Sequence, residues 1–245
     1  MIKDSEKRVL LLTGSDSNMH PVLDLTIPSK LRYARKYGYD FMSLSSFKKY
    51  PEYNIDNDHI GLGFSRTLYM FKMLEHYDVI MWLDADSIIT NDSYSIDKFL
   101  TEDHTLYFSY DWPVASDGST NHRGFSGGNF ILQHTKNISE VFQMFMYKSQ
   151  TYLKDSGADQ ACFNWIYNHT NIRSHIKILD HKYLGAVPEF IKTTEVWRND
   201  KNRVGPNSTF NIASPWNEDC FIAHLTGCST ADRINMLNNQ LKKYL

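Results

Sequence analysis

The chain has 245 residues, of which 42% are hydrophobic and 22% are charged, and its formal net charge is −2. This composition is ordinary for a globular protein with a sizeable core, and the small net charge gives no field that would attract nucleic acid or an anionic membrane. The three cysteines lack CxxC spacing and are odd in number, which argues against a zinc site and against a disulfide framework.

The N-terminal segment is charged and leads directly into an apolar run, so it does not have the pattern of a signal peptide. No apolar run in the sequence is long enough to span a bilayer. Both features favour a cytoplasmic location. Four N-x-Ser/Thr sequons, at Asn91, Asn137, Asn168 and Asn207, favour the alternative of a lumenal domain that lacks its membrane anchor.

Apolar patterning predicts alternating strands and helices in the first third of the chain. The expected elements are a strand at 8–13, a helix at 28–37, a strand at 39–43, a helix at 62–76 and a strand at 78–83. This order predicts a parallel sheet with helices on its faces. Strands are also expected at 106–110, 129–132 and 220–225, and helices at 138–153, 159–167 and 230–245. Residues 184–217 contain three prolines and many polar residues, which predicts irregular loops.

Two carboxylates directly follow the apolar strand that ends at Leu83. Ligands of open α/β sheets bind beyond the carboxyl ends of the strands, and residues i and i+2 of an extended chain project to the same side. Asp84 and Asp86 can therefore converge on one cation, for which Mg²⁺ or Mn²⁺ suits the oxygen ligands. The same spacing at Asp56 and Asp58 has no strand before it and is interpreted as a solvated turn. The alternative for the first pair is a strand end that caps the next helix.

Four patches in chain order, at 82–89, 123–132, 157–164 and 221–228, resemble motifs of one enzyme family. The first resembles the Asp-x-Asp motif of glycosyltransferases with the A-type (GT-A) fold. The second is similar to the glycine-containing strand beside their donor sugar, the third to the Asp-Gln helix start of retaining members, and the fourth to their His-x-x-Gly patch. The likeness is closest to plant and fungal retaining galactosyl-, xylosyl- and mannosyltransferases, although Leu225 replaces their usual aromatic residue.

The resemblance implies an α/β fold with a mostly parallel central sheet flanked by helices. It implies one Rossmann-like, nucleotide-sugar-binding domain over residues 1–245, with a nucleotide-binding part at about 7–90 and an acceptor-side part at about 91–245. The implied reaction moves a hexose or pentose from a nucleotide sugar, expected to be UDP-linked, to a glycan or other hydroxyl acceptor. The expected cofactor is Mn²⁺ or Mg²⁺, and the expected outcome is retention of the anomeric configuration.

Most of the candidate site residues lie in these motifs, and Thr13 and Arg66, which lie outside them, are added as candidates for donor binding. The expected metal ligands are Asp84, Asp86 and His224, the expected donor-binding residues are Thr13, Arg66, Asp84, Gly128, Asn129 and Gly227, and the expected catalytic residues are Asp159 and Gln160. The residue types suit these roles, because a neutral imidazole binds metals and the Asn129 amide offers both a donor and an acceptor to sugar hydroxyls.

The residue types alone also allow structural roles. An isolated histidine at a strand end, such as His224, is more often structural than a ligand. Gly127 and Gly128 could form only a turn, and Asp159 could simply open a helix, since acidic residues are favoured in a first turn. Arg66 could lie on a solvated helix face instead of binding a diphosphate.

Two rival functions are considered. Phosphatases of the haloacid dehalogenase type also place Asp-x-Asp after an apolar strand, with the first Asp as nucleophile. Their motif lies near the start of the core, whereas two strands and two helices are expected before Asp84. A non-catalytic nucleotide-sugar or glycan-binding module needs no complete metal triad. No residue is an obvious general base, which fits front-face retention, and Asp111 is the fallback base for an inverting enzyme.

Overall fold

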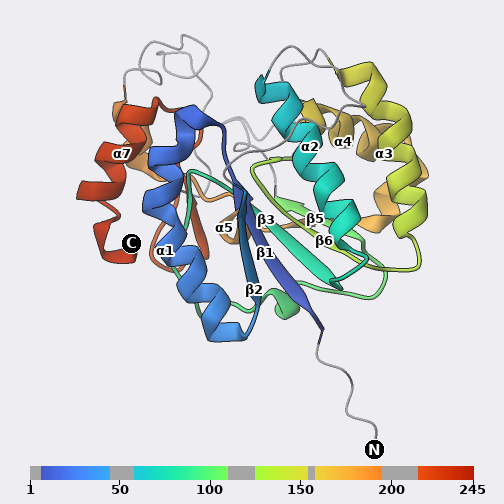
Figure 1. Ribbon diagram of the computed structural model, residues 1–245, viewed down its shortest axis with the longest axis horizontal. Helices are drawn as coiled ribbons and strands as arrows, with labels where there is room; N and C mark the ends of the chain where they lie inside the picture. Colours follow the sequence, from blue (N-terminus) through green and yellow to red (C-terminus); the bar gives the residue numbers. More distant parts are fainter. Residues whose placement is uncertain (1–6, 45–57, 110–124, 154–157, 195–214) are drawn as a thin grey trace, which may run out of the picture.

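The computed structural model describes residues 7–44, 58–109, 125–153, 158–194 and 215–245 (Figure 1). The strands are β1 (Val9–Gly14), β2 (Asp40–Leu44), β3 (Val79–Asp84), β4 (Ser87–Ile89), β5 (Leu106–Ser109), β6 (Asn129–Gln133), β7 (Ile176–Leu179) and β8 (Ile222–His224). The helices are α1 (His20–Tyr37), α2 (Asp58–Met73), α3 (Ile138–Tyr152), α4 (Ala158–His169), α5 (His181–Leu184) and α7 (Thr230–Asn239). Short 3-10 helices lie at Ser17–Met19, Ile96–Lys98, Asn171–His175, Glu189–Thr193 and Lys242–Tyr244.

Six strands form the central sheet in the order β2-β1-β3-β6-β5-β7. β1 is parallel to β2 and β3, and β5 is parallel to β7, whereas β6 is antiparallel to both of its neighbours. The expected α/β fold with a mostly parallel sheet is therefore confirmed. Because β6 runs in the opposite direction, its first residue, Asn129, lies beside Leu83 at the carboxyl end of β3. This reversal brings the glycines before β6 next to the acidic pair after β3.

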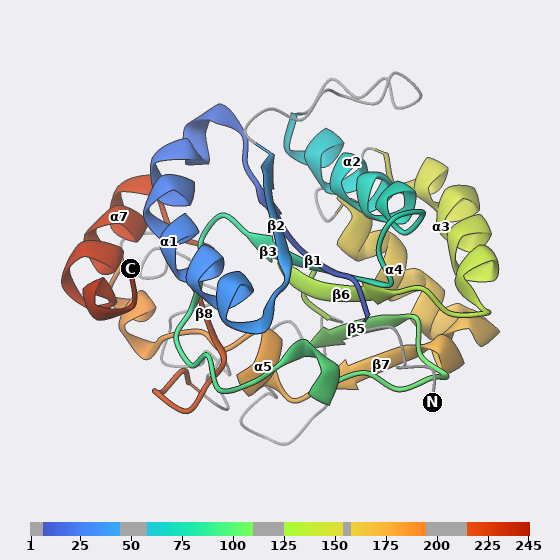
Figure 2. The same cartoon turned by 60° about the horizontal axis from the view of Figure 1, so that its bottom comes forward.

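Side-chain alternation along the strands divides the core between the two faces of the sheet, as a period of two requires. On β3, Ile80 and Trp82 pack with residues of α2, α3 and α4, whereas Met81 and Leu83 pack on the other face with Tyr33 of α1. Figure 2 shows α2, α3 and α4 on one side of the sheet and α1 with α7 on the other. Asp84 shares the side of Trp82, so it points toward α2.

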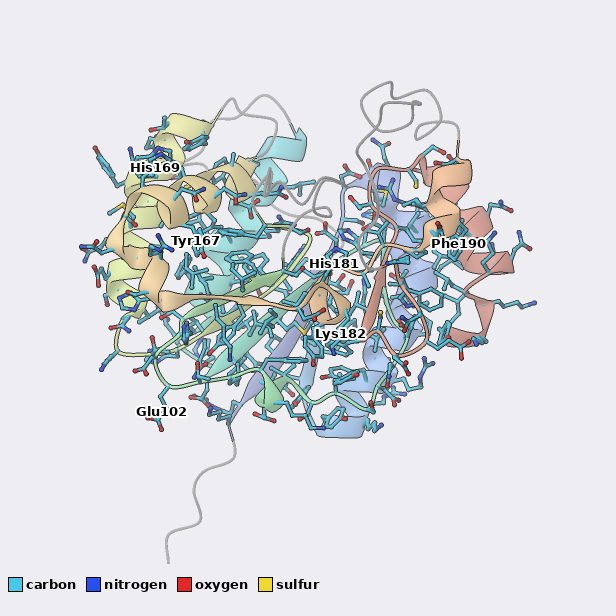
Figure 3. The ribbon with its side chains drawn as sticks, turned by 180° about the vertical axis from the view of Figure 1, so that it is seen from behind. Glu102, Tyr167, His169, His181, Lys182 and Phe190 are labelled. Atoms are coloured by element: carbon cyan, nitrogen blue, oxygen red, sulfur yellow. The ribbon has the colours of Figure 1, made fainter. Side chains whose placement is uncertain are left out.

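A second, two-stranded sheet joins the C-terminal region to the acidic loop. β4 and β8 are antiparallel, with Ser87 opposite His224. Apolar residues of this sheet, of α1 and of α7 share a third buried cluster. From behind, Figure 3 places His181 and Lys182 of α5 between α4, which carries His169, and the segment that carries Phe190. His224 therefore lies beside β4, the strand that begins immediately after Asp86.

Several element boundaries differ from the expected ones. The first helix begins at His20 and not at residue 28. Pro21 lies in its first turn, where the missing N–H of proline costs no hydrogen bond, because the first N–H groups of a helix have no acceptor within it. The pattern does not predict β4 or β7, which are too short for a period to show. The last helix ends at Asn239. Among the described residues, no helix combines the length and apolarity needed to cross a bilayer. The expected division near residue 90 stays a prediction.

Candidate active site

Three side chains of types that can bind a metal ion meet at the carboxyl edge of the sheet. Asp84 ends β3, Asp86 lies in the turn before β4, and His224 ends β8. The His224 Nε2 atom lies 3.3 Å from Asp86 Oδ1 and 3.9 Å from Asp84 Oδ2. One ligand atom from each residue lies within 4.8 Å of the other two. The residues that the sequence analysis predicts for a metal site are therefore brought together from distant parts of the chain.

Each aspartate uses its second oxygen to pair with an arginine. Asp84 Oδ1 accepts hydrogen bonds of 2.7 Å from Arg66 Nη1 and from the Trp82 indole. Asp86 Oδ2 accepts one of 2.8 Å from Arg233 Nε. One oxygen of each carboxylate is thus left facing His224. Three such ligands fit Mn²⁺ or Mg²⁺, because these ions can then keep further positions for phosphate oxygens or water.

The pKa values of the two carboxyls shift in opposite directions. Burial raises the pKa of Asp84, with Arg66 opposing the rise and Asp86 adding to it. Burial also acts to raise the pKa of Asp86, but His224 and Arg233 outweigh it and hold that pKa well below its usual range. A divalent cation between the two carboxylates would favour the ionised form of both. The electrostatics of the group therefore suit a cation as well as its geometry does.

Gly128 lies in direct contact with this group. A Cβ atom at Gly128 would lie 2.4 Å from His224 Cε1 and 3.0 Å from Asp84 Oδ2. The carbonyl of Gly128 also accepts a hydrogen bond of 2.9 Å from the Asp84 amide. A glycine is therefore needed here because any side chain would collide with His224 and Asp84, and its role toward the donor stays a prediction.

Asn129 and Thr13 have surroundings that differ from the expected donor contacts. The Asn129 amide is fully buried, donates to the Leu184 carbonyl at 2.8 Å and accepts from the Asp84 N–H at 3.3 Å. The Thr13 hydroxyl is also fully buried and donates to the Leu83 carbonyl at 2.7 Å. Both side chains hold the strand ends in place, because their polar atoms are used inside the protein. The contacts of both residues with a donor stay predictions.

Arg66 connects the end of β3 to the start of α4. Its Nε and Nη2 atoms each donate to an oxygen of Asp159 at 3.0 Å, and its Nη1 atom donates to Asp84. Thr67 adds a hydrogen bond of 2.6 Å to Asp159. Burial alone would lower the pKa of Arg66, but Asp159 and Asp84 raise it above its usual range. The side chain is 12% exposed, so Arg66 does not lie on a solvated face, and its binding to the diphosphate of a donor stays a prediction.

The start of α4 has an unusual backbone conformation. Ala158, immediately before Asp159, has a φ of +46°, which is strained for a residue with a Cβ atom. Gln160, which follows Asp159, accepts a hydrogen bond of 2.9 Å from the Gly127 amide. The predicted catalytic pair thus lies against the glycine segment and Arg66. Gly227 has a φ of +72°, which a glycine adopts without strain, and its role toward the donor stays a prediction.

A family model decides the identity of the protein. The model described as the galactosyl transferase GMA12/MNN10 family matches residues 5–235. The chain belongs to this family. It is therefore a glycosyltransferase, and the phosphatase alternative is not favoured. No curated protein sequence matches the chain significantly.

Solved structures show the same fold as this transferase. A glycosyltransferase involved in the glycosylation of the major capsid of PBCV-1 superposes with a TM-score of 0.62 at 14% identity, over 94% of this chain and 98% of that one. The galactosyltransferase LgtC, in complex with donor and acceptor sugar analogues, gives 0.52 at 12% identity, over 96% and 100%. Mouse xyloside xylosyltransferase 1 gives 0.52 at 13% identity, over 89% and 97%. At these identities the likeness shows a shared fold, which confirms the expected GT-A architecture.

The sequence patterns do not predict the buried lysine of the transferase. Lys30 of α1 is fully buried, and its Nζ atom donates to Thr13 Oγ1 at 3.0 Å and to the Asp84 carbonyl at 2.8 Å. One turn earlier, Thr26 donates to the Ala85 carbonyl at 2.7 Å. The only signal in the sequence is the spacing of four residues, which puts both side chains on one helix face. α1 therefore fixes the backbone between the two aspartates.

Lys30→Met should change how stability depends on pH. Burial lowers the pKa of Lys30 to about 7 from 10.5, against the opposing effects of Asp86 and Asp84. Between these values the unfolded chain binds more protons, so the free energy of unfolding should rise with pH. We expect the metal-free transferase to gain ~2 kcal/mol from this residue between pH 7 and 9, a gain that Lys30→Met lacks. Urea unfolding in EDTA measures it, and parallel pH profiles would mean that Lys30 stays charged.

Proposed function

We propose that the transferase moves a hexose or pentose from a UDP-linked sugar to a hydroxyl of a glycan, with Mn²⁺ or Mg²⁺ held by Asp84, Asp86 and His224. The observation that carries the proposal is the convergence of three ligand atoms within 4.8 Å at the carboxyl edge of the sheet. A site for two substrates is supported by LgtC, whose structure is a complex with donor and acceptor sugar analogues. Which sugar, nucleobase and acceptor the enzyme selects depends on the shape of the pocket around this site.

Departure of a nucleotide from a sugar leaves negative charge on a diphosphate, and a bound divalent cation would stabilise that charge as a Lewis acid. The residues of the chain hold the geometry for this step. Arg66 fixes Asp84 and Asp159 together, and Gln160 fixes the Gly127 amide. Asp159 acts in this proposal by positioning Arg66, because both of its oxygens are already paired.

The pairing of the carboxylates also supports retention. Among the described residues of the site, Asp84 and Asp159 pair with Arg66, and Asp86 pairs with Arg233. The two arginines already engage both oxygens of Asp159 and one oxygen of each of the other two carboxylates, which leaves few oxygen lone pairs to accept a proton from an acceptor hydroxyl. The leaving phosphate would then accept the proton of the acceptor hydroxyl on the same face of the sugar. Asp111, the fallback base for inversion, lies outside the described residues.

The proposal is tested by incubating the transferase with a panel of nucleotide sugars and Mn²⁺. We expect a UDP-α-sugar to be consumed and its sugar to appear as the α-anomer, either on an acceptor or on water, as anomeric proton couplings show in an NMR time course. EDTA should stop the reaction, and added Mn²⁺ should restore it. A β-product would reject retention and direct attention to Asp111, whereas turnover unaffected by EDTA would reject the metal.

A further inference from the structure

Arg233 of α7 joins the acidic loop to the segment that follows His224. Its Nε atom donates to Asp86 Oδ2 at 2.8 Å and to the Leu225 carbonyl at 3.1 Å, and its Nη1 atom donates to the Cys228 carbonyl. The Arg233 side chain is 14% exposed and that of Asp86 is 7% exposed, so solvent screens this pair only weakly. One guanidinium therefore holds three oxygen acceptors on two separate segments of the chain, and its Nη1 atom also contacts Met19 Sδ at 3.7 Å.

The direction of the contact matters for the cation site. Arg233 holds Asp86 Oδ2, whereas the other oxygen of that carboxylate, Oδ1, lies 3.3 Å from His224 Nε2. The Leu225 amide, next to His224, donates to the Asp86 carbonyl at 3.1 Å. A planar guanidinium can contact a carboxylate and two carbonyls at fixed angles, which a lysine ammonium cannot reproduce.

We propose that Arg233 is a positioning residue of the cation site, whose planar fork turns Asp86 Oδ1 toward His224 and holds the segment after His224 against the acidic loop. The inference rests on the proposed function. Two effects oppose each other here. The positive charge of Arg233 repels a cation, whereas a fixed ligand binds it more tightly. The ligand oxygen is the one that Arg233 does not contact, and the carboxylate lies between the two charges, so orientation should dominate.

The test measures Mn²⁺ binding alone, without nucleotide, by the EPR signal of the free ion. Removing a group that orients a metal ligand typically weakens metal binding by about 10–100-fold, and we expect this loss in Arg233→Met. Arg233→Lys should also bind Mn²⁺ more weakly than the wild type, because an ammonium keeps the charge and loses the fork. Turnover of both variants should recover at saturating Mn²⁺, which a merely misfolded protein would not show.

Two control variants separate this contact from the docking of the C-terminal helix. Arg32→Met removes an arginine that also binds backbone carbonyls, those of Tyr244 and Leu245, but touches no metal ligand. Ser229→Ala removes the N-cap of α7, whose hydroxyl accepts the Asp232 N–H at 3.1 Å. Both should keep the Mn²⁺ affinity of the wild type, although their thermal midpoints fall.

The outcomes are distinct. Equal or tighter Mn²⁺ binding by Arg233→Met, or full affinity in Arg233→Lys, would overturn the role of the fork. The same loss in Arg32→Met or Ser229→Ala would overturn it too, because docking of α7 would then suffice. If Arg233→Met does not fold, the lysine variant alone decides. A wild type that binds no Mn²⁺ would instead reject the proposed cation site itself.

Discussion

Asp86→Ala should abolish the Mn²⁺-dependent binding of UDP and lower turnover by roughly 10³-fold, as the loss of several kcal/mol of transition-state stabilisation by a cation implies. The Asp86 side chain is nearly buried, its Oδ1 atom lies beside His224, and Arg233 holds its other oxygen. Removing the carboxylate also leaves Arg233 without its charged partner in a part of the protein that excludes most water. We therefore expect this variant to be less stable as well as inactive.

Asp86→Asn separates the two effects. The amide keeps an oxygen that can accept from Arg233 but carries no charge, so the fold should be better preserved while cation binding is still lost. Calorimetric titration of UDP with and without Mn²⁺ measures the effect. Asp92→Ala is the matched control, because that half-exposed aspartate pairs with Lys36 at 2.7 Å and is not one of the three residues of the proposed cation site. Unchanged Mn²⁺-dependent affinity in Asp86→Asn would remove Asp86 from the metal site.

The sequence predicts those parts of the site that depend on a pattern of neighbouring residues. An apolar run followed by two acids already implies a strand end with converging carboxylates, because both the run and the spacing lie within 79–86. The position of His224 beside them comes from the resemblance and not from any local pattern. Its strand, β8, pairs with β4, which is only three residues long and gives no periodic signal.

The partners of the carboxylates could not be predicted, because they depend on packing between distant segments. Asp86 and Arg233 are 147 residues apart, and Arg66 and Asp159 are 93 apart. Helical periodicity puts Arg66 off the apolar face of its helix, a position that normally faces solvent. In the structure α4 covers this position, and Gly63 lets it approach so closely that a Cβ there would lie 2.9 Å from Asp159 Oδ1. Periodicity identifies a polar face but does not identify what packs on it.

Gly128→Ala should disable the cation site without removing any ligand. The added methyl group would lie 2.4 Å from His224 Cε1 and 3.0 Å from Asp84 Oδ2, so at least one ligand must move. The imidazole is nearly buried and has little space to rotate. A displacement of about 1 Å at a reacting group can cost about 100-fold in rate, and overpacking typically costs about 1–3 kcal/mol of stability. We expect losses of this size in turnover and in the free energy of unfolding.

Ser126→Ala is the control for the local segment, because it removes a hydrogen bond of 3.2 Å to the Gly128 amide and adds no atoms. A double-mutant cycle with His224→Ala then identifies the cause of the loss. If the methyl group acts by displacing the imidazole, Gly128→Ala should weaken Mn²⁺ binding strongly when His224 is present. It should have hardly any effect in the His224→Ala background, because the two changes then remove the same ligand. Additive losses would mean that the methyl group acts through Asp84 or the backbone instead, and His224 would then have to be tested as a ligand on its own.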